Sequence, residues 1–148
     1  MNTGTQPFVI LLAEDEPADA HLVKTALAEN RIVSELHHVV DGHEVFEFLR
    51  QTGPRFAAAP RPDLILLDLN MPRMDGRECL AALKKDESLR DIPVVILTTS
   101  EVERDVVASY NLGASGYIAK PVDIVQFITA IRHLGDYWIT LVRLPHRT

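Results

Sequence analysis

Five short apolar segments recur along the chain, separated by longer stretches of mixed polarity. They are FVILLA (8–13), ELHHVV (35–40), DLILLD (63–68), PVVILT (93–98) and SGYIAK (115–120). Three of the five are nearly continuous in Val, Ile and Leu, which is typical of strands covered on both faces of a parallel sheet. The pattern predicts five strands.

Apolar residues repeat at helical spacing between and after these segments. The repeats are Leu22, Val23, Ala26 and Leu27; Val45, Phe46 and Leu49; Cys79, Leu80 and Leu83; Val102, Val106, Val107 and Tyr110; and Ile124, Phe127, Ile131 and Leu134. Pro17 suits a first helical position and Asp75 an N-cap. The alternation of strands and helices predicts an α/β fold: a doubly wound parallel sheet with right-handed crossovers.

Composition narrows the class of protein. The 148 residues are 24% charged and 47% apolar, as expected for one globular domain. The net charge of −6 argues against binding to nucleic acid or to an anionic membrane surface. The single cysteine, Cys79, lies in a helical apolar repeat and is interpreted as a buried thiol of an intracellular protein. No transmembrane run or signal peptide is recognised, so we expect a cytoplasmic location.

Two polar or irregular features carry no functional prediction. Residues 51–62, QTGPRFAAAPRP, are interpreted as a surface insertion. His37, His38 and His43 suggest a metal site, but neighbouring strand residues point to opposite faces. We therefore expect ordinary surface or edge histidines.

Polar side chains collect where the predicted strands end. They are Glu14 and Asp15, Asp68 and Asn70, Thr98 and Thr99, and Lys120. Taken singly, such residues are usually turn or cap residues. In a parallel sheet, however, the carboxyl ends of the strands meet at one edge, and clustered acids there repel unless a cation is bound. The set describes a Mg²⁺ site with a lysine and a hydroxyl nearby, suited to phosphoryl transfer.

Four separated motifs together resemble the receiver domain of two-component response regulators. The motifs are ED (14–15), DLNMPRMDG (68–76), TT (98–99) and KP (120–121). The resemblance covers roughly residues 8–134. It implies a flavodoxin-like five-stranded sheet in the order 2-1-3-4-5 with five helices, followed by a C-terminal apolar extension.

The resemblance also implies a metal site and an acceptor. Asp68 is the expected phosphoacceptor, attacking the phosphorus of a phosphohistidine or of a small phosphodonor. Mg²⁺ is expected to bind Asp15, Asp68 and the backbone carbonyl of Asn70, with Glu14 acting through water. Many family members have an aspartate at the position of Glu14.

The resemblance assigns roles to four further residues. Lys120 and Thr98 are expected to contact phosphoryl oxygens, and Thr98 with Tyr117 to form the conformational switch. For Tyr117, a half-buried strand aromatic is the structural alternative. The Lys120–Pro121 bond is expected to be cis.

Softer motifs indicate a subtype. HHVVDGHEVFEFLRQ (37–51), the insertion before RPDLILLDLNMP (61–72), and YWITLVRLP (137–145) resemble stand-alone regulators that pair with phytochrome-type sensor kinases. A sensor histidine kinase of another type is the alternative partner. We divide the chain into a receiver domain, 1–134, and an extension, 135–148.

The extension is apolar and has no sheet of a minimal receiver left to cover. Its candidate contact residues are Trp138, Leu141, Val142 and Leu144. We expect them to form a homodimer contact; folding back on the domain is the alternative.

Two other functions compete with phosphorylation-dependent signalling. An aspartate-nucleophile phosphatase needs a second Asp two residues after the nucleophile, where this chain has Asn70. A degenerate receiver acting only as a binding module is disfavoured because the acids, hydroxyl and lysine are all present. We expect the protein to have no enzymatic activity other than its own phosphorylation and slow autodephosphorylation. Relay of the phosphoryl group to a downstream phosphotransfer protein stays open.

Overall fold

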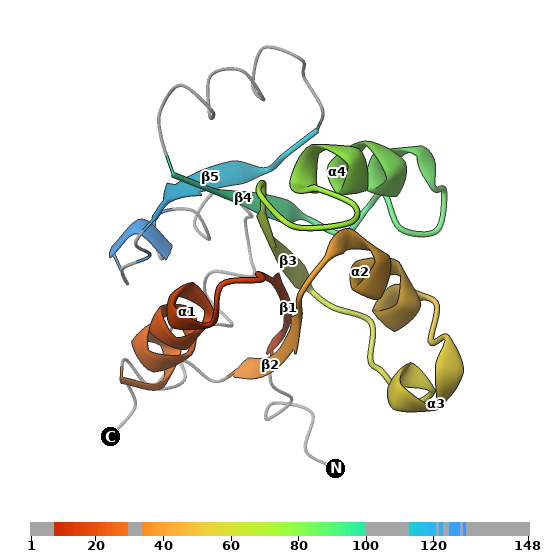
Figure 1. The fold of residues 1–148 in the computed structure, drawn as a ribbon, viewed down its shortest axis with the longest axis horizontal. Coiled ribbons are helices and arrows are strands. Elements are labelled where there is room, and N and C mark those ends of the chain that lie inside the picture. The colour runs from red at the N-terminus through yellow and green to blue at the C-terminus, as the bar shows by residue number, and fades with distance from the viewer. Residues whose placement is uncertain are drawn as a thin grey trace.

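The fold is a five-stranded parallel sheet with helices on both faces (Figure 1). The computed structural model describes residues 8–29, 34–99, 113–120, 122, 125–127 and 129. The strands are β1 (Phe8–Ala13), β2 (Ser34–Val39), β3 (Leu64–Asp68), β4 (Val94–Thr98) and β5 (Gly116–Ala119). Their order is β2-β1-β3-β4-β5, which confirms the predicted flavodoxin-like sheet.

The helices begin where the sequence signals them. They are α1 (Pro17–Glu29), α2 (Gly42–Leu49), α3 (Gly53–Phe56) and α4 (Gly76–Lys85). Pro17 is the first residue of α1, as predicted. Asp75 caps α4 in a reciprocal pair with Glu78, so that each side chain accepts from the other residue's backbone N–H. Residues 125–127 are helical, whereas the helix predicted around 102–110 lies outside the described residues.

The core has two layers because alternate strand residues face opposite sides of the sheet. In β1, Leu11 and Ala13 pack with residues of α2, α3 and α4, whereas Ile10 and Leu12 pack with residues of α1. Figure 1 shows α1 on one side of the sheet and α2, α3 and α4 on the other. Every residue of β3 and of β4 is buried, which fits their continuous apolar sequence.

The segment 51–62 is mostly exposed, as expected for a surface insertion, but it is not wholly irregular. It contains the single turn α3, and Phe56 in that turn is buried. The Phe56 ring lies edge-on to Phe48 of α2, with 5.5 Å between the ring centroids. The insertion is therefore anchored to the core by one aromatic side chain.

Several predictions fall outside the described residues. They concern the cis bond before Pro121 and the dimer contacts of Trp138, Leu141, Val142 and Leu144. In the described part of the chain, no helix has the length and apolar character needed to cross a bilayer.

Candidate functional site

The sheet registers bring the predicted polar residues to one edge. Ala13 lies beside Leu67, so the residues that follow β1 lie next to the end of β3. Asp68 in turn lies beside Leu97 of β4, and Thr98 beside Ala119 of β5. The backbone N–H of Lys120 donates to the Thr98 carbonyl at 2.8 Å. Strand ends far apart in sequence thus form one edge, as expected for a doubly wound sheet.

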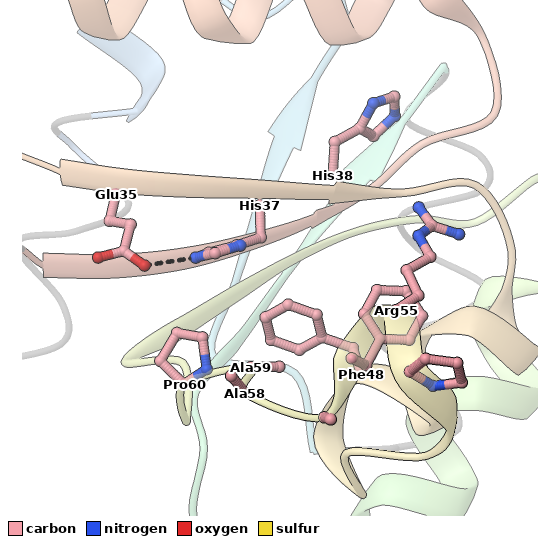
Figure 2. A pocket seen from close by; sticks show the side chains of 11 residues that line it. Glu35, His37, His38, Phe48, Arg55, Ala58, Ala59 and Pro60 are labelled. Carbon is pink, nitrogen blue, oxygen red and sulfur yellow. Dashed lines mark hydrogen bonds and ion pairs between the residues drawn. The ribbon is translucent and has the colours of Figure 1, made fainter.

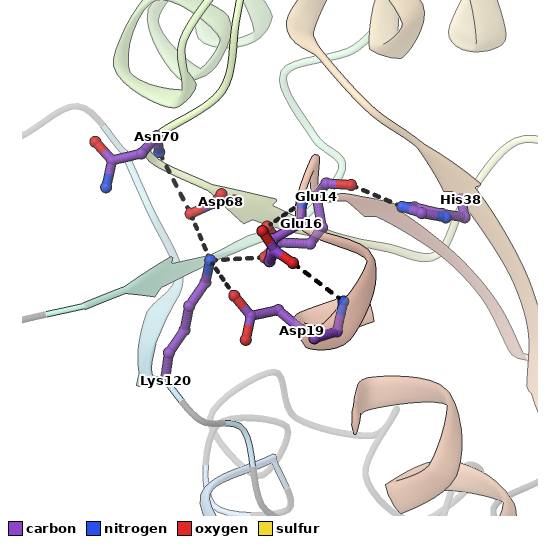
Figure 3. Close-up of polar contacts among 8 residues, drawn as sticks. Glu14, Glu16, Asp19, His38, Asp68, Asn70 and Lys120 are labelled. Atoms are coloured by element: carbon purple, nitrogen blue, oxygen red, sulfur yellow. Dashed lines mark hydrogen bonds and ion pairs between the residues drawn. The ribbon is translucent and has the colours of Figure 1, made fainter. Parts of the chain in front are cut away.

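Lys120 is the centre of this edge (Figure 3). Its Nζ lies 2.8 Å from Glu14 Oε1, 3.1 Å from Asp68 Oδ1 and 3.2 Å from Asp19 Oδ2. The Lys120 side chain is 11% exposed, and those of Glu14 and Asp68 are almost completely buried. One ammonium therefore partly offsets three carboxylates in a site that excludes most water. Asp19 was not predicted as a site residue. Its place in the first turn of α1, the helix that follows the acidic end of β1, is a sequence pattern that indicates it.

The acidic residues are close enough to share one cation. Carboxylate oxygens of Glu14, Asp15 and Asp68 all lie within 4.8 Å of one another. Glu14 Oε1 is buried, and apart from its ion pair with Lys120 no hydrogen bond of good geometry reaches it within the described residues. Asp15 is exposed and leaves the cluster open to solvent on one side. This set of oxygen donors fits a hard divalent cation that keeps some of its water.

The pKa values of Glu14 and Asp68 are raised, which means that burial destabilises their ionised forms. Burial, together with the nearby Asp68 charge, raises the pKa of Glu14 to about 7, and Lys120 only partly offsets this. Burial also raises the pKa of Asp68, against the lowering effects of Glu14 and Lys120. For Lys120, burial lowers the pKa, but the two carboxylates outweigh burial and raise it. A divalent cation would favour the ionised carboxylates.

Backbone N–H groups contact two of the carboxylates, and an imidazole contacts the backbone beside them. Glu16 N–H donates to Glu14 Oε2 at 3.1 Å, and Asn70 N–H to Asp68 Oδ1 at 3.3 Å. His38 Nε2 lies 2.7 Å from the backbone carbonyl of Glu14, so this nitrogen must carry the proton. No sequence pattern predicted this position for His38. Its contact follows from the pairing of β1 with β2.

Of the two expected switch residues, Thr98 lies at this edge, whereas Tyr117 lies within β5 opposite Ile96. Thr98 is buried at the end of β4, and the half-buried Tyr117 of β5 packs against the core layer of α2, α3 and α4. The structure thus gathers Glu14, Asp68 and Lys120 as the sequence led us to expect. The catalytic and switching roles assigned to these side chains stay predictions.

A separate hollow lies beside the edge strand β2 (Figure 2). Its volume is about 470 Å³, and its walls include His37, Phe48, Phe56 and Pro60. His37 is held there by a 2.6 Å contact from its Nε2 to Glu35 Oε2. None of the acidic cluster lines this hollow, so it is not part of the candidate site.

The chain matches known proteins in sequence and in fold. The sequence pattern of the response regulator receiver domain matches residues 10–132. This chain belongs to the response regulator receiver family. The receiver is 44% identical over 139 residues to response regulator Rcp1 of Synechocystis sp. (strain ATCC 27184 / PCC 6803 / Kazusa), covering 94% of each chain.

Solved structures give the same relationship. The bacteriophytochrome response regulator AtBRR is 41% identical, with a TM-score of 0.82, covering 88% of this receiver and 94% of that chain. The phosphorylated cyanobacterial phytochrome response regulator RcpA is 43% identical, with a TM-score of 0.73 and coverages of 90% and 95%. A structure of Rcp1 in its Mn²⁺-bound form has a TM-score of 0.71 and 44% identity, with coverages of 89% and 94%. The relatives thus include phytochrome response regulators and, separately, a response regulator solved with bound Mn²⁺.

Proposed function

We propose that this receiver accepts a phosphoryl group on Asp68 from a phosphohistidine of a sensor histidine kinase. The observation that carries the proposal is the buried Asp68 carboxylate, 3.1 Å from Lys120 and within 4.8 Å of the Glu14 and Asp15 oxygens. A buried carboxylate beside one fixed cation and two further acids is suited to phosphoryl transfer rather than to a structural cap.

The chemistry is an in-line displacement at phosphorus. An Asp68 oxygen forms the new O–P bond as the P–N bond to the kinase imidazole breaks, and the electron pair of that bond stays on the imidazole nitrogen. The Lys120 Nζ lies 3.1 Å from Asp68 Oδ1, where it is placed to pair with phosphoryl oxygens. Thr98 is the proposed hydroxyl donor to those oxygens.

Mg²⁺ is the proposed cation, held by Asp15, Asp68 and the Asn70 backbone carbonyl, with Glu14 acting through water. When bound, it supplies positive charge that offsets the carboxylates and the phosphoryl oxygens. The acidic cluster and its raised pKa values support a divalent cation at this position. Magnesium suits it because it retains water and takes few carboxylates.

The signalling step is proposed to be a population shift. Phosphorylation draws Thr98 towards the phosphoryl group, and Tyr117 moves into the space that opens. Because Tyr117 is half-buried against the core, its position fits both an outward orientation before phosphorylation and an inward orientation after it. The chain is proposed to act on no other substrate and to catalyse only its own phosphorylation and slow dephosphorylation.

The proposed kinase is of the phytochrome type, supported by the likeness to the phytochrome response regulators AtBRR and RcpA. A homodimer through Trp138, Leu141, Val142 and Leu144 is proposed from the sequence alone. Sedimentation at about tens of micromolar tests it, since a modest interface has an affinity of this order. A monomer at that concentration would contradict the dimer.

The test of the function is labelling by radioactive acetyl phosphate in the presence of Mg²⁺. Asp68→Asn should lose the label completely because the amide cannot form the acyl phosphate. Asp63→Asn is the matched control: Asp63 precedes the same strand, and its carboxylate accepts the Val9 backbone N–H at 2.8 Å. Labelling of Asp68→Asn at the wild-type rate and stoichiometry would refute the proposal.

A further inference from the structure

The loop between β3 and α4 is tied to the start of α2 by an ion pair. Arg73 in the loop donates from Nε and Nη2 to Asp41 Oδ2, at 2.8 and 2.5 Å. Asp41 is the N-cap of α2, and its Oδ1 accepts from the Glu44 N–H at 2.9 Å. One buried carboxylate, 4% exposed at its side chain, therefore connects a helix terminus to a loop 32 residues away.

The backbone of the same loop also touches α2. The Gly42 N–H donates to the Met74 carbonyl at 3.1 Å. A Cβ added at Gly42 would lie 2.6 Å from both the Met74 Cβ and the Met74 carbonyl oxygen, so the two backbones are in direct contact. Arg73 itself has a φ of 65°, a conformation that costs a non-glycine residue free energy unless its surroundings hold it. The ion pair with Asp41 supplies that restraint.

The ends of the loop are fixed to the phosphoacceptor strand. At the first end, the Asn70 N–H donates to Asp68 Oδ1. At the other, the Gly76 N–H donates to the Leu69 carbonyl at 2.9 Å, and a Cβ on Gly76 would lie 2.4 Å from the Asp68 carbonyl oxygen. The loop is thus held at both ends beside Asp68, and in its middle by the buried Met71 side chain and by the contacts of Arg73 and Met74 with the start of α2. Arg73 lies three residues after Asn70 in this loop.

We infer that Arg73 is a positioning residue for the phosphoacceptor loop, acting through its ion pair with Asp41. The pair holds residues 69–75 in the conformation that presents the Asn70 backbone carbonyl to the cation site. This inference rests on the proposed function, because it assigns the carbonyl a role in binding the divalent cation. Groups that orient a metal ligand commonly affect metal affinity although they do not touch the metal.

Four variants separate positioning from simple support of α2. Arg73→Gln removes the positive charge of the ion pair. Asp41→Asn removes the negative charge but keeps a side chain that caps α2. The double variant closes a thermodynamic cycle. Arg55→Gln is the matched control: Arg55 of α3 pairs with Glu44 of α2 at 2.8 Å, its side chain is 60% exposed, and it takes no part in the contacts described above between α2 and the loop.

Three measurements are made on each full-length variant: Mg²⁺ affinity by calorimetry, hydrogen exchange at the Gly42 amide, and the rate of labelling by acetyl phosphate. Arg73→Gln should bind Mg²⁺ roughly 10-fold more weakly. The Gly42 amide should exchange faster, because its acceptor is the Met74 carbonyl. Asp41→Asn should show the same losses, and the double variant should be no worse than either single one. Arg55→Gln should match the wild type.

Arg73→Lys guards against a variant that fails to fold. It keeps the charge, so it should recover part of the Mg²⁺ affinity. Wild-type Mg²⁺ affinity and labelling rate in a folded Arg73→Gln, even with a lower melting temperature, would show a purely structural role and overturn the inference. A wild-type chain that neither binds Mg²⁺ nor becomes labelled would instead overturn the proposed function, and this inference with it.

Discussion

Replacing Glu14 with Gln removes a buried negative charge with little change in shape. The Glu14 side chain is completely buried, 2.8 Å from Lys120 and beside Asp68. Burial raises its pKa from 4.5 to about 7, so its ionised form is less stable in the folded protein than in the unfolded chain. Lys120 keeps Asp68 and Asp19 as partners in the variant.

The sign of the pH dependence follows from this shift. Between pH 4.5 and about 7 the folded state holds the Glu14 proton more tightly than the unfolded state does. The free energy of unfolding of the metal-free wild type therefore falls as pH rises through this window, and levels off above it. At about 1.4 kcal/mol per pKa unit, the charge costs on the order of 3 kcal/mol above the window. Gln carries no such cost.

Urea unfolding in EDTA measures the difference between Glu14→Gln and the wild type. At about pH 8 the variant should be more stable by on the order of 3 kcal/mol, and at about pH 5 by less than roughly 1 kcal/mol. Glu16→Gln serves as the control because its carboxylate is exposed. Its stability should stay within about 0.5 kcal/mol of the wild type at both pH values.

Two results would refute this reasoning. One is a Glu14→Gln variant that is less stable than the wild type at about pH 8, which would mean that the Lys120 pair outweighs burial. The other is an equal stability difference at both pH values, which would show that ionisation is not the cause. In the proposed function the same variant should bind Mg²⁺ more weakly, so stability and phosphotransfer change in opposite directions.

Two substitutions test the support of the acceptor strand, and a thiol reagent tests the burial of Cys79. Asp75→Ala removes the cap of α4 and should lower the free energy of unfolding in urea by about 1 kcal/mol. Gly76→Ala places a Cβ 2.4 Å from the Asp68 carbonyl oxygen; it should cost about 1–3 kcal/mol and slow acetyl phosphate labelling. Burial raises the pKa of Cys79 to about 12, so Ellman's reagent should react with it only in urea, and rapid reaction of the native protein would contradict this.

Much of the fold was readable from local pattern. The continuous apolar runs of β3 and β4 predicted strands buried on both faces, and both are completely buried. Pro17 and Asp75 marked helix starts because their preferences arise from backbone chemistry within a few residues. The edge that gathers Glu14, Asp68 and Lys120 followed from one rule about parallel sheets.

Other contacts of the site could not be read in this way. Asp19 lies 101 residues before Lys120, and its ion pair depends on how α1 leaves β1. The 2.7 Å contact of His38 with the Glu14 carbonyl depends on the register of β2. For Phe56, only packing against Phe48 shows that the insertion is anchored. Each requires the direction of a side chain relative to a distant element.

The sequence by itself determined the alternation of strands and helices, the family, and the set of polar residues at the strand ends. Those properties depend on periodicity and on short motifs, which are local in the chain. Tertiary structure alone decided how charge is balanced at Lys120 and that Arg73 pairs with Asp41. Such pairs form only after the sheet brings distant segments together, and their strength depends on burial, which no short stretch of sequence specifies.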